Sequence, residues 1–175
     1  GPLPPYTARA ENPPLGGDNR FFNNIFIRSG GPPAAGRETD ADPLRFGGYG
    51  LWVYNHREFP LLTGGNVYLN GARPYFDEEP ALRAPAAAPA PAIAGEGDAV
   101  YLRLKLPSAL AEAATELVNT QRLGKAKVSG LPYEDAAGAP VVIDRDYLGS
   151  ERSRTRPTPG PFERPGQSEV KLKVW

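Results

Sequence analysis

The segment WVYNHREF, residues 52–59, gathers side chains of the kinds that bind neutral glycans. Such sites combine an aromatic platform with a few polar groups that fix hydroxyls. On a strand, alternation would put the rings of Trp52 and Tyr54 on one face with His56. We therefore predict substrate contacts at Trp52, Tyr54, His56, Arg57 and Glu58. The alternative is that the two rings pack against neighbouring segments while His56 satisfies a turn carbonyl.

Carboxylates could supply acid–base or nucleophilic chemistry, but their surroundings favour other roles. The acidic run of residues 77–79, Asp-Glu-Glu, follows a turn and is predicted to be a solvated surface. Asp144 and Asp146 are predicted to form a turn, with a salt bridge to Arg145 or Arg152. We predict no catalytic residue in this chain.

The charge and residue balance narrows the possible partners. Twenty Lys and Arg side chains offset twenty Asp and Glu, which argues against nucleic acid or a membrane surface as partner. The absence of cysteine and the single histidine argue against a metal site, and nothing suggests a cofactor. No apolar run reaches the roughly 20 residues of a membrane helix, and no signal peptide is recognised. We expect a cytoplasmic protein, with secretion left open.

The N-terminal half is predicted to form short strands separated by bends. Strands are expected at residues 20–27, 49–55 and 66–70, after a Pro-rich lead-in. Residues 29–48 form a Gly/Pro-rich insertion, expected to be a loop. The Ala/Pro stretch of residues 83–97 is expected to be a polyproline-like spacer crossing a surface, or alternatively a flexible linker between two domains.

Apolar and polar residues alternate more clearly in the C-terminal half of the sequence. Val100, Leu102, Leu104 and Leu106 share one face of a half-buried strand, and residues 169–174 alternate in the same way. Between them, Ser108 is predicted to cap a helix of about three turns. The last residue, Trp175, is expected to cover an open end of the structure.

Two asparagines precede apolar triplets in the same manner. Asn24 stands before Ile-Phe-Ile, and Asn66 stands before Val-Tyr-Leu. In a parallel β-helix, equivalent corners stack at the strand spacing of about 4.8 Å, so side-chain amides can form a hydrogen-bonded ladder. Asparagine also tolerates the left-handed backbone of such bends. The alternative is that each asparagine caps a strand of an antiparallel sheet.

The segment IDRDYLGSERSRTRPTPGPFE, residues 143–163, resembles the ending of many parallel β-helix proteins. The resemblance rests on an Asp-x-Asp-x-x-Gly turn, an Arg after it and a Gly-x-Phe-Glu segment. The matching residues are Asp144, Asp146, Gly149, Arg152, Gly160, Phe162 and Glu163. Pro161 departs from the pattern, since such endings often have a small residue there.

The chain also resembles the C-terminal portion of the β-xylosidases of glycoside hydrolase family 120. This resemblance rests on DNRFFNNIFI, LWVYNHREFPLLTGGNVYLNGARP, LVNTQRLGKAKVSGLPYEDAAGAPVVIDRDYLGSER and the closing LKVW. The resemblance spans nearly the whole chain apart from residues 29–48 and 83–97. It implies an all-β fold, namely the C-terminal coils of a right-handed parallel β-helix, with additional strands and one short helix. It also implies a retaining hydrolase acting on xylo-oligosaccharides, with its two carboxylates on coils upstream of this chain.

We therefore expect coils in residues 1–82, the spacer in 83–97, and a closing strand-helix-strand part in 98–175. Expected partners are a xylo-oligosaccharide or other neutral glycan, and either a second polypeptide carrying the upstream β-helix or further copies of this chain. The alternative function is a non-catalytic carbohydrate-binding or structural module. A polysaccharide lyase is a weaker third possibility, because the chain has no calcium-loop pattern.

Overall fold

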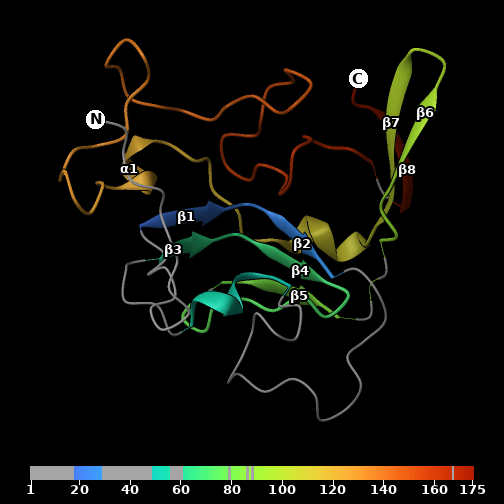
Figure 1. Ribbon diagram of the computed structural model, residues 1–175, viewed down its shortest axis with the longest axis horizontal. Coiled ribbons are helices and arrows are strands. Elements are labelled where there is room, and N and C mark those ends of the chain that lie inside the picture. The colour runs from blue at the N-terminus through green and yellow to red at the C-terminus, as the bar shows by residue number, and fades with distance from the viewer. Residues whose placement is uncertain are drawn as a thin grey trace, which may run out of the picture.

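The computed structural model describes residues 18–28, 49–55, 61–78, 80–85, 87, 89–166 and 168–175. Within them the fold is all-β, with eight short strands, two 3₁₀ helices and one α-helix of a single turn. The strands form one two-stranded sheet and two three-stranded sheets (Figure 1). No helix among these residues has the length and apolar character needed to cross a membrane.

The N-terminal strands pair in parallel, as the repeated asparagines suggested. Strand β1 (Asn19–Phe22) pairs with β3 (Leu61–Gly64). Strand β2 (Ile25–Ile27) pairs with β4 (Val67–Leu69), which pairs on its other side with β5 (Leu82–Ala84). The register places Ile25 beside Val67, so Asn24 and Asn66 occupy equivalent positions immediately before the two strands.

The single strand predicted for residues 20–27 is broken at Asn23. This residue has a φ of 57°, in the left-handed region that asparagine tolerates better than most side chains. At the equivalent position before the second strand stands Gly65, with a φ of 66°. A Cβ there would clash with Oδ1 of Asn23, which explains a glycine at this corner.

Residues 49–55 do not form the predicted strand. Leu51–Tyr54 is instead a 3₁₀ helix, η1, entered through Gly50, whose φ of 99° is accessible to glycine. The apolar run in this segment is short, and a short run does not distinguish a strand from a buried helical turn. The strand that leads to the second asparagine corner is β3.

The antiparallel sheet confirms the alternation of the C-terminal half. Strand β7 (Ala99–Leu106) lies between β6 (Ala92–Glu96) and β8 (Ser168–Lys173). The stretch of residues 83–97, expected to be a spacer, thus contributes residues to β5 and all of β6. Trp175 is 80% exposed, so the prediction that it covers an open end is wrong, although its carbonyl accepts a hydrogen bond from Val100 N–H at 2.9 Å.

The prediction of a three-turn helix that begins at Ser108 is also wrong. A 3₁₀ helix, η2 (Ser108–Glu112), follows Pro107, and no side-chain cap begins it. The chain then runs without regular structure to α1 (Thr120–Leu123). Tertiary contacts override helix propensity here, because Ala113 is buried and the hydroxyl of buried Thr115 donates to Pro157 O.

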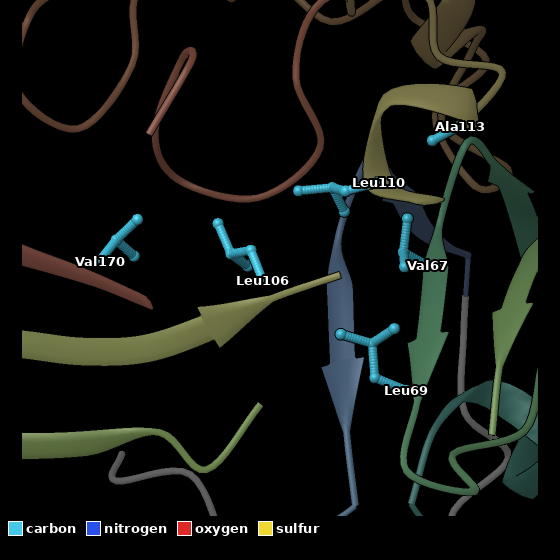
Figure 2. Close-up of a cluster of buried hydrophobic side chains, with 6 residues drawn as sticks. All are labelled: Val67, Leu69, Leu106, Leu110, Ala113 and Val170. Carbon is cyan, nitrogen blue, oxygen red and sulfur yellow. The ribbon is translucent and has the colours of Figure 1, made fainter. Parts of the chain in front are cut away.

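One apolar core joins the parallel and antiparallel sheets. Val67 and Leu69 of β4 face η2 and the ends of β7 and β8, as Figure 2 shows. The cluster comprises Val67, Leu69, Leu106, Leu110, Ala113 and Val170. The opposite face of β4 carries Tyr68, which packs with Leu51 and Ala72 in a second cluster. The sheet β2–β4–β5 is therefore covered on both faces.

Candidate functional site

The structure places the two aromatic residues of the predicted sugar site on η1. Trp52 is only 3% exposed, and the guanidinium of Arg73 lies over its ring at 4.5 Å. Tyr54 is partly buried, and its ring centroid lies 5.7 Å from that of Phe21. A sugar could reach the face of Trp52 only after Arg73 moves aside.

The other three predicted contacts, His56, Arg57 and Glu58, lie outside the described residues. The strand geometry on which the shared face of Trp52, Tyr54 and His56 was argued is absent at Trp52 and Tyr54, because both belong to a 3₁₀ helix. Sugar binding at this segment remains a prediction.

The asparagine corners form the hydrogen-bonded ladder that the sequence predicted. Oδ1 of Asn66 accepts from the backbone N–H of Asn24 at 2.8 Å and from its side-chain amide at 3.0 Å. The amide of Asn66 donates in turn to Phe21 O at 2.8 Å. Asn66 is fully buried, and these bonds satisfy an amide that would otherwise be costly to bury.

Glu78 extends this ladder and corrects a prediction. Asp77 is exposed, but Glu78 is 3% exposed rather than part of a solvated face, and Glu79 lies outside the described residues. Oε1 of Glu78 accepts from the Asn66 amide at 2.8 Å, and Oε2 accepts from the Tyr68 hydroxyl at 2.6 Å. Burial raises the pKa of Tyr68 well above its usual value, and the bond to Glu78 raises it further.

No local signal in the sequence identifies Glu78 as the buried member of an acidic run. Its partners Asn66 and Tyr68 lie 12 and 10 residues earlier in the chain, and they meet the carboxylate only in the folded structure. A surface hollow of about 490 Å³ borders Glu78 together with Pro80, Ala81 and Arg83. Both carboxylate oxygens already accept hydrogen bonds, so this group holds the corner rather than standing ready as a nucleophile.

The C-terminal turn is built around Asp146, as predicted, but without the predicted salt bridge. Its Oδ1 accepts from Leu148 N–H and Ser150 N–H, and its Oδ2 from Glu163 N–H. Burial raises the pKa of Asp146, but these bonds and the charge of Arg152 outweigh it and leave that pKa below its usual value. Among the residues described, neither carboxylate forms a salt bridge with Arg145 or Arg152, although Arg152 N–H donates to the backbone carbonyl of Asp144 at 2.8 Å.

The side chain of Arg152 instead contacts the closing segment, residues 158–163. Its guanidinium donates to Thr158 O at 2.9 Å and Gly160 O at 2.8 Å, and it lies 3.8 Å from the carboxylate of Glu163. The side chain of Glu163 is 5% exposed and accepts from Thr158 N–H. Several residues of the predicted closing pattern thus lie close together and form one hydrogen-bonded cluster.

A hollow of about 400 Å³ lies between η2 and this closing segment, bordered by Ser108, Leu110, Arg156 and Glu163 among others. In the described part of the chain, no three His, Asp or Glu side chains come together in a way that could hold a metal ion. The buried polar side chains described above, those of Asn66, Glu78 and Asp146, therefore form hydrogen bonds that hold bends and turns of the chain.

Comparison with solved structures gives a match over almost the entire chain. The chain is similar to XylC in its complex with xylose, at 29% sequence identity and a TM-score of 0.75. The match covers 92% of this chain but 27% of XylC, so the chain spans about a quarter of the length of that protein. No protein-family model and no curated protein sequence matches it. The chain thus shares the fold of one part of a much longer protein solved with bound xylose.

Proposed function

We propose that this chain is the C-terminal part of a right-handed parallel β-helix glycosidase that releases xylose from xylo-oligosaccharides. The observation that carries the proposal is the match to XylC in complex with xylose over 92% of the chain. The parallel register of β1 with β3 and of β4 with β2 and β5 supports it, because the strands of successive coils in a parallel β-helix pair in this way.

The proposed reaction retains the configuration of the sugar. Retention requires a nucleophilic carboxylate and a general acid/base about 5 Å apart across the glycosidic bond. We place this pair on coils upstream of the present chain, as the resemblance to family 120 implies, and the 27% coverage of XylC leaves most of such a protein outside this chain. The buried carboxylates described above already accept hydrogen bonds from donors in this chain, namely those of Glu78, Asp146 and Glu163.

In this proposal the chain contributes a wall of the sugar site through Trp52, Tyr54, His56, Arg57 and Glu58. Displacement of Arg73 from the face of Trp52 would open the platform that a pyranose ring needs. Binding at this place should therefore change the fluorescence of Trp52, whereas Trp175 is exposed and distant in sequence. A Trp175→Phe variant isolates the signal of Trp52.

The test is intact-mass and native-gel analysis of the purified material, with hydrolysis of 4-nitrophenyl β-xyloside measured on the same fractions. We expect activity only where a longer polypeptide, or a second chain, accompanies these residues. Activity that follows the isolated chain would refute the placement of the carboxylates upstream. Binding of xylotriose by the isolated chain, with no hydrolysis in any fraction, would favour a carbohydrate-binding module instead.

A further inference from the structure

The hollow between η2 and the closing segment holds a buried carboxylate with one oxygen free to accept. The side chain of Glu163 is 5% exposed and borders the hollow. Its Oε2 accepts from Thr158 N–H at 2.9 Å, but its Oε1 accepts no hydrogen bond from the residues that the structure describes. This oxygen retains some accessible surface, unlike the unpaired and fully buried Oδ1 of Asn23. Buried polar atoms normally have a hydrogen-bond partner, so Oε1 can take a donor from a ligand.

The residues around this hollow differ in exposure, and the difference separates a floor from a rim. Leu110 and Pro157 are buried and give the floor apolar surface beside the carboxylate. The exposed border residues include Ser108, Arg156 and Arg164. The volume of about 400 Å³ falls within the roughly 300–1,000 Å³ of small-molecule sites. The hollow therefore has the size and the mixed lining of a site for a small polar ligand.

The two arginines at the rim have hydrogen-bond donors to spare. Arg156 donates once, to Ala111 O at 3.4 Å, and a guanidinium carries five N–H groups. The side chain of Arg164 is 84% exposed, and its Nε lies 3.9 Å from Oε1 of Glu163, which is too far for a hydrogen bond. Within the described part of the chain, its guanidinium forms no hydrogen bond. Guanidinium groups bind carboxylates in a planar, bidentate manner, so this rim favours an acidic group.

The local charge agrees with this preference, although the whole chain is neutral. Residues 151–164 contain four arginines and two glutamates. Arg152 lies 3.8 Å from the carboxylate of Glu163, and Arg154 lies 3.9 Å from that of Glu151. Neither of these two arginines borders the hollow. The excess positive charge thus belongs to the arginines at the rim, where it attracts an anion.

The backbone at the rim is held in an uncommon conformation. Arg164 has a φ of 50°, in the left-handed region that side chains other than glycine and asparagine rarely adopt. Its N–H donates to Oγ1 of Thr158 at 3.2 Å. The same Thr158 donates its own N–H to Glu163. Strained residues of this kind are concentrated at ligand-binding sites. The turn fixes Arg164 directly after the buried carboxylate.

We propose that this hollow binds a uronic acid, a pyranose sugar that carries both hydroxyls and a carboxylate. A sugar hydroxyl donates to Oε1 of Glu163, and the ligand's carboxylate is bound by Arg156 and Arg164. The apolar floor contacts the C–H face of the ring. A simple anion would leave Glu163 unused, and a neutral sugar would leave the arginines unused. The proposal does not depend on the proposed glycosidase activity, and none of its residues belongs to the segment of residues 52–59.

The experiment is an NMR titration of the complete 175-residue chain with sodium D-glucuronate at constant ionic strength. We expect saturable shifts of the backbone amide signals of Ser108, Thr158 and Arg164. D-xylose has the same ring and hydroxyls without the carboxylate, and sodium acetate has the carboxylate without the ring. Each should bind at least tenfold more weakly than glucuronate.

A further titration identifies the source of the acid. Xylotriose that carries a glucuronic acid branch presents the same sugar on a glycan chain. Tighter binding of this oligosaccharide than of free glucuronate identifies a glycan as the ligand, and equal affinity identifies the free acid. Both results support a uronic acid site.

Variants test the assigned contacts. Arg156→Gln and Arg164→Gln should each weaken glucuronate binding at least fivefold. Glu163→Gln should do the same, because its amide NH₂ replaces the acceptor Oε1 while its carbonyl still accepts from Thr158. The matched control is Arg154→Gln, since this side chain is 76% exposed and does not border the hollow. Its effect should be smaller than twofold.

The proposal is overturned if glucuronate shifts none of these amide signals, or if acetate or D-xylose binds as tightly as glucuronate. It is also overturned if Arg154→Gln weakens binding as much as Arg156→Gln. Unchanged amide signals of residues 67–69 show that the Glu163→Gln variant remains folded, and the exposed arginines test the site independently of it. None of these readouts involves hydrolysis, so the site and the proposed function can fail separately.

Discussion

The side-chain amide of Asn66 lies 2.8 Å from Oε1 of Glu78 and donates to it, although both residues are buried. This bond continues the hydrogen bond from the Asn24 amide to Oδ1 of Asn66, two residues that precede neighbouring parallel strands. The Tyr68 hydroxyl donates to the other carboxylate oxygen, so Glu78 fixes both the corner and a core ring. The polar interior of this bend is thus satisfied without any solvent contact at Asn66.

Replacing Glu78 by Gln should destabilise the chain by about 2 kcal/mol, because the amide NH₂ would face a donor and leave a buried group unpaired. Chemical denaturation gives the free energy of unfolding. The control is Asp77→Asn at the exposed neighbour, which should change that free energy by less than about 0.5 kcal/mol. Equal effects of the two substitutions would show that Glu78 is not held as described.

Tyr68 should remain protonated at a pH where exposed tyrosines ionise. Burial and the bond to Glu78 raise its pKa well above the usual value of 10.0, so the phenol stays neutral in the folded chain at pH 11. Its favourable contribution to stability is complete below pH 10 and declines above it, since the unfolded chain then ionises this tyrosine. Absorbance at 295 nm should show the same amplitude at pH 11 for the wild type and Tyr68→Phe, while both remain folded. A smaller amplitude in the variant would contradict the raised pKa.

Asp146 should make stability depend on pH in the acid range. The folded state lowers the pKa of this carboxyl group, so the group stabilises the fold above the unfolded value near 3.8, and this contribution is lost as pH falls through the folded pKa. Asp146→Asn should therefore lower the melting temperature at pH 7, and the gap to the wild type should narrow below pH 4. With Asp77→Asn as the control, a constant gap across this range would contradict the assignment.

Gly50 should not tolerate a side chain. Its φ is 99°, and a Cβ would collide with the carbonyl oxygen of Arg73, the residue with which it forms a parallel β-bridge. Gly50→Ala should destabilise the chain by about 3 kcal/mol, combining backbone strain with displaced packing. Gly97→Ala provides the match, since Gly97 also has a positive φ but nothing within 4 Å of the added Cβ. Its cost should be about 1 kcal/mol, and a similar cost at both sites would refute the clash.

The local sequence pattern predicted the structure correctly where a single physical rule determined the local conformation. The alternation of Val100 to Leu106 predicted β7, because a sheet with one buried face needs every second residue apolar. The repeated Asn before an apolar triplet predicted the stacked corners, where Oδ1 of Asn66 accepts from the side-chain amide of Asn24. The turn at Asp146 was predicted for a similar reason, as its carboxylate bonds to backbone groups two and four residues ahead.

The local sequence pattern gave wrong predictions where tertiary contacts determined the conformation or the burial of a residue. The run containing Trp52 became a 3₁₀ helix because Arg73 packs on its ring and Gly50 bridges to the same residue. The alanine-rich stretch after Ser108 lost its helix because Leu110 and Ala113 pack into the core beside β4. Glu78 is buried rather than solvated, and its carboxylate accepts hydrogen bonds from the Asn66 amide and the Tyr68 hydroxyl.

The amino-acid sequence by itself predicted the asparagine before each apolar triplet, the two clearest strands of the antiparallel sheet and the turn at Asp146, since each of these patterns lies within a short stretch of the chain. Only the tertiary structure decided that Trp52 is covered and that Glu78 is buried. Those outcomes depend on which strands become neighbours, and the burial of a side chain is set by what the rest of the chain brings to it.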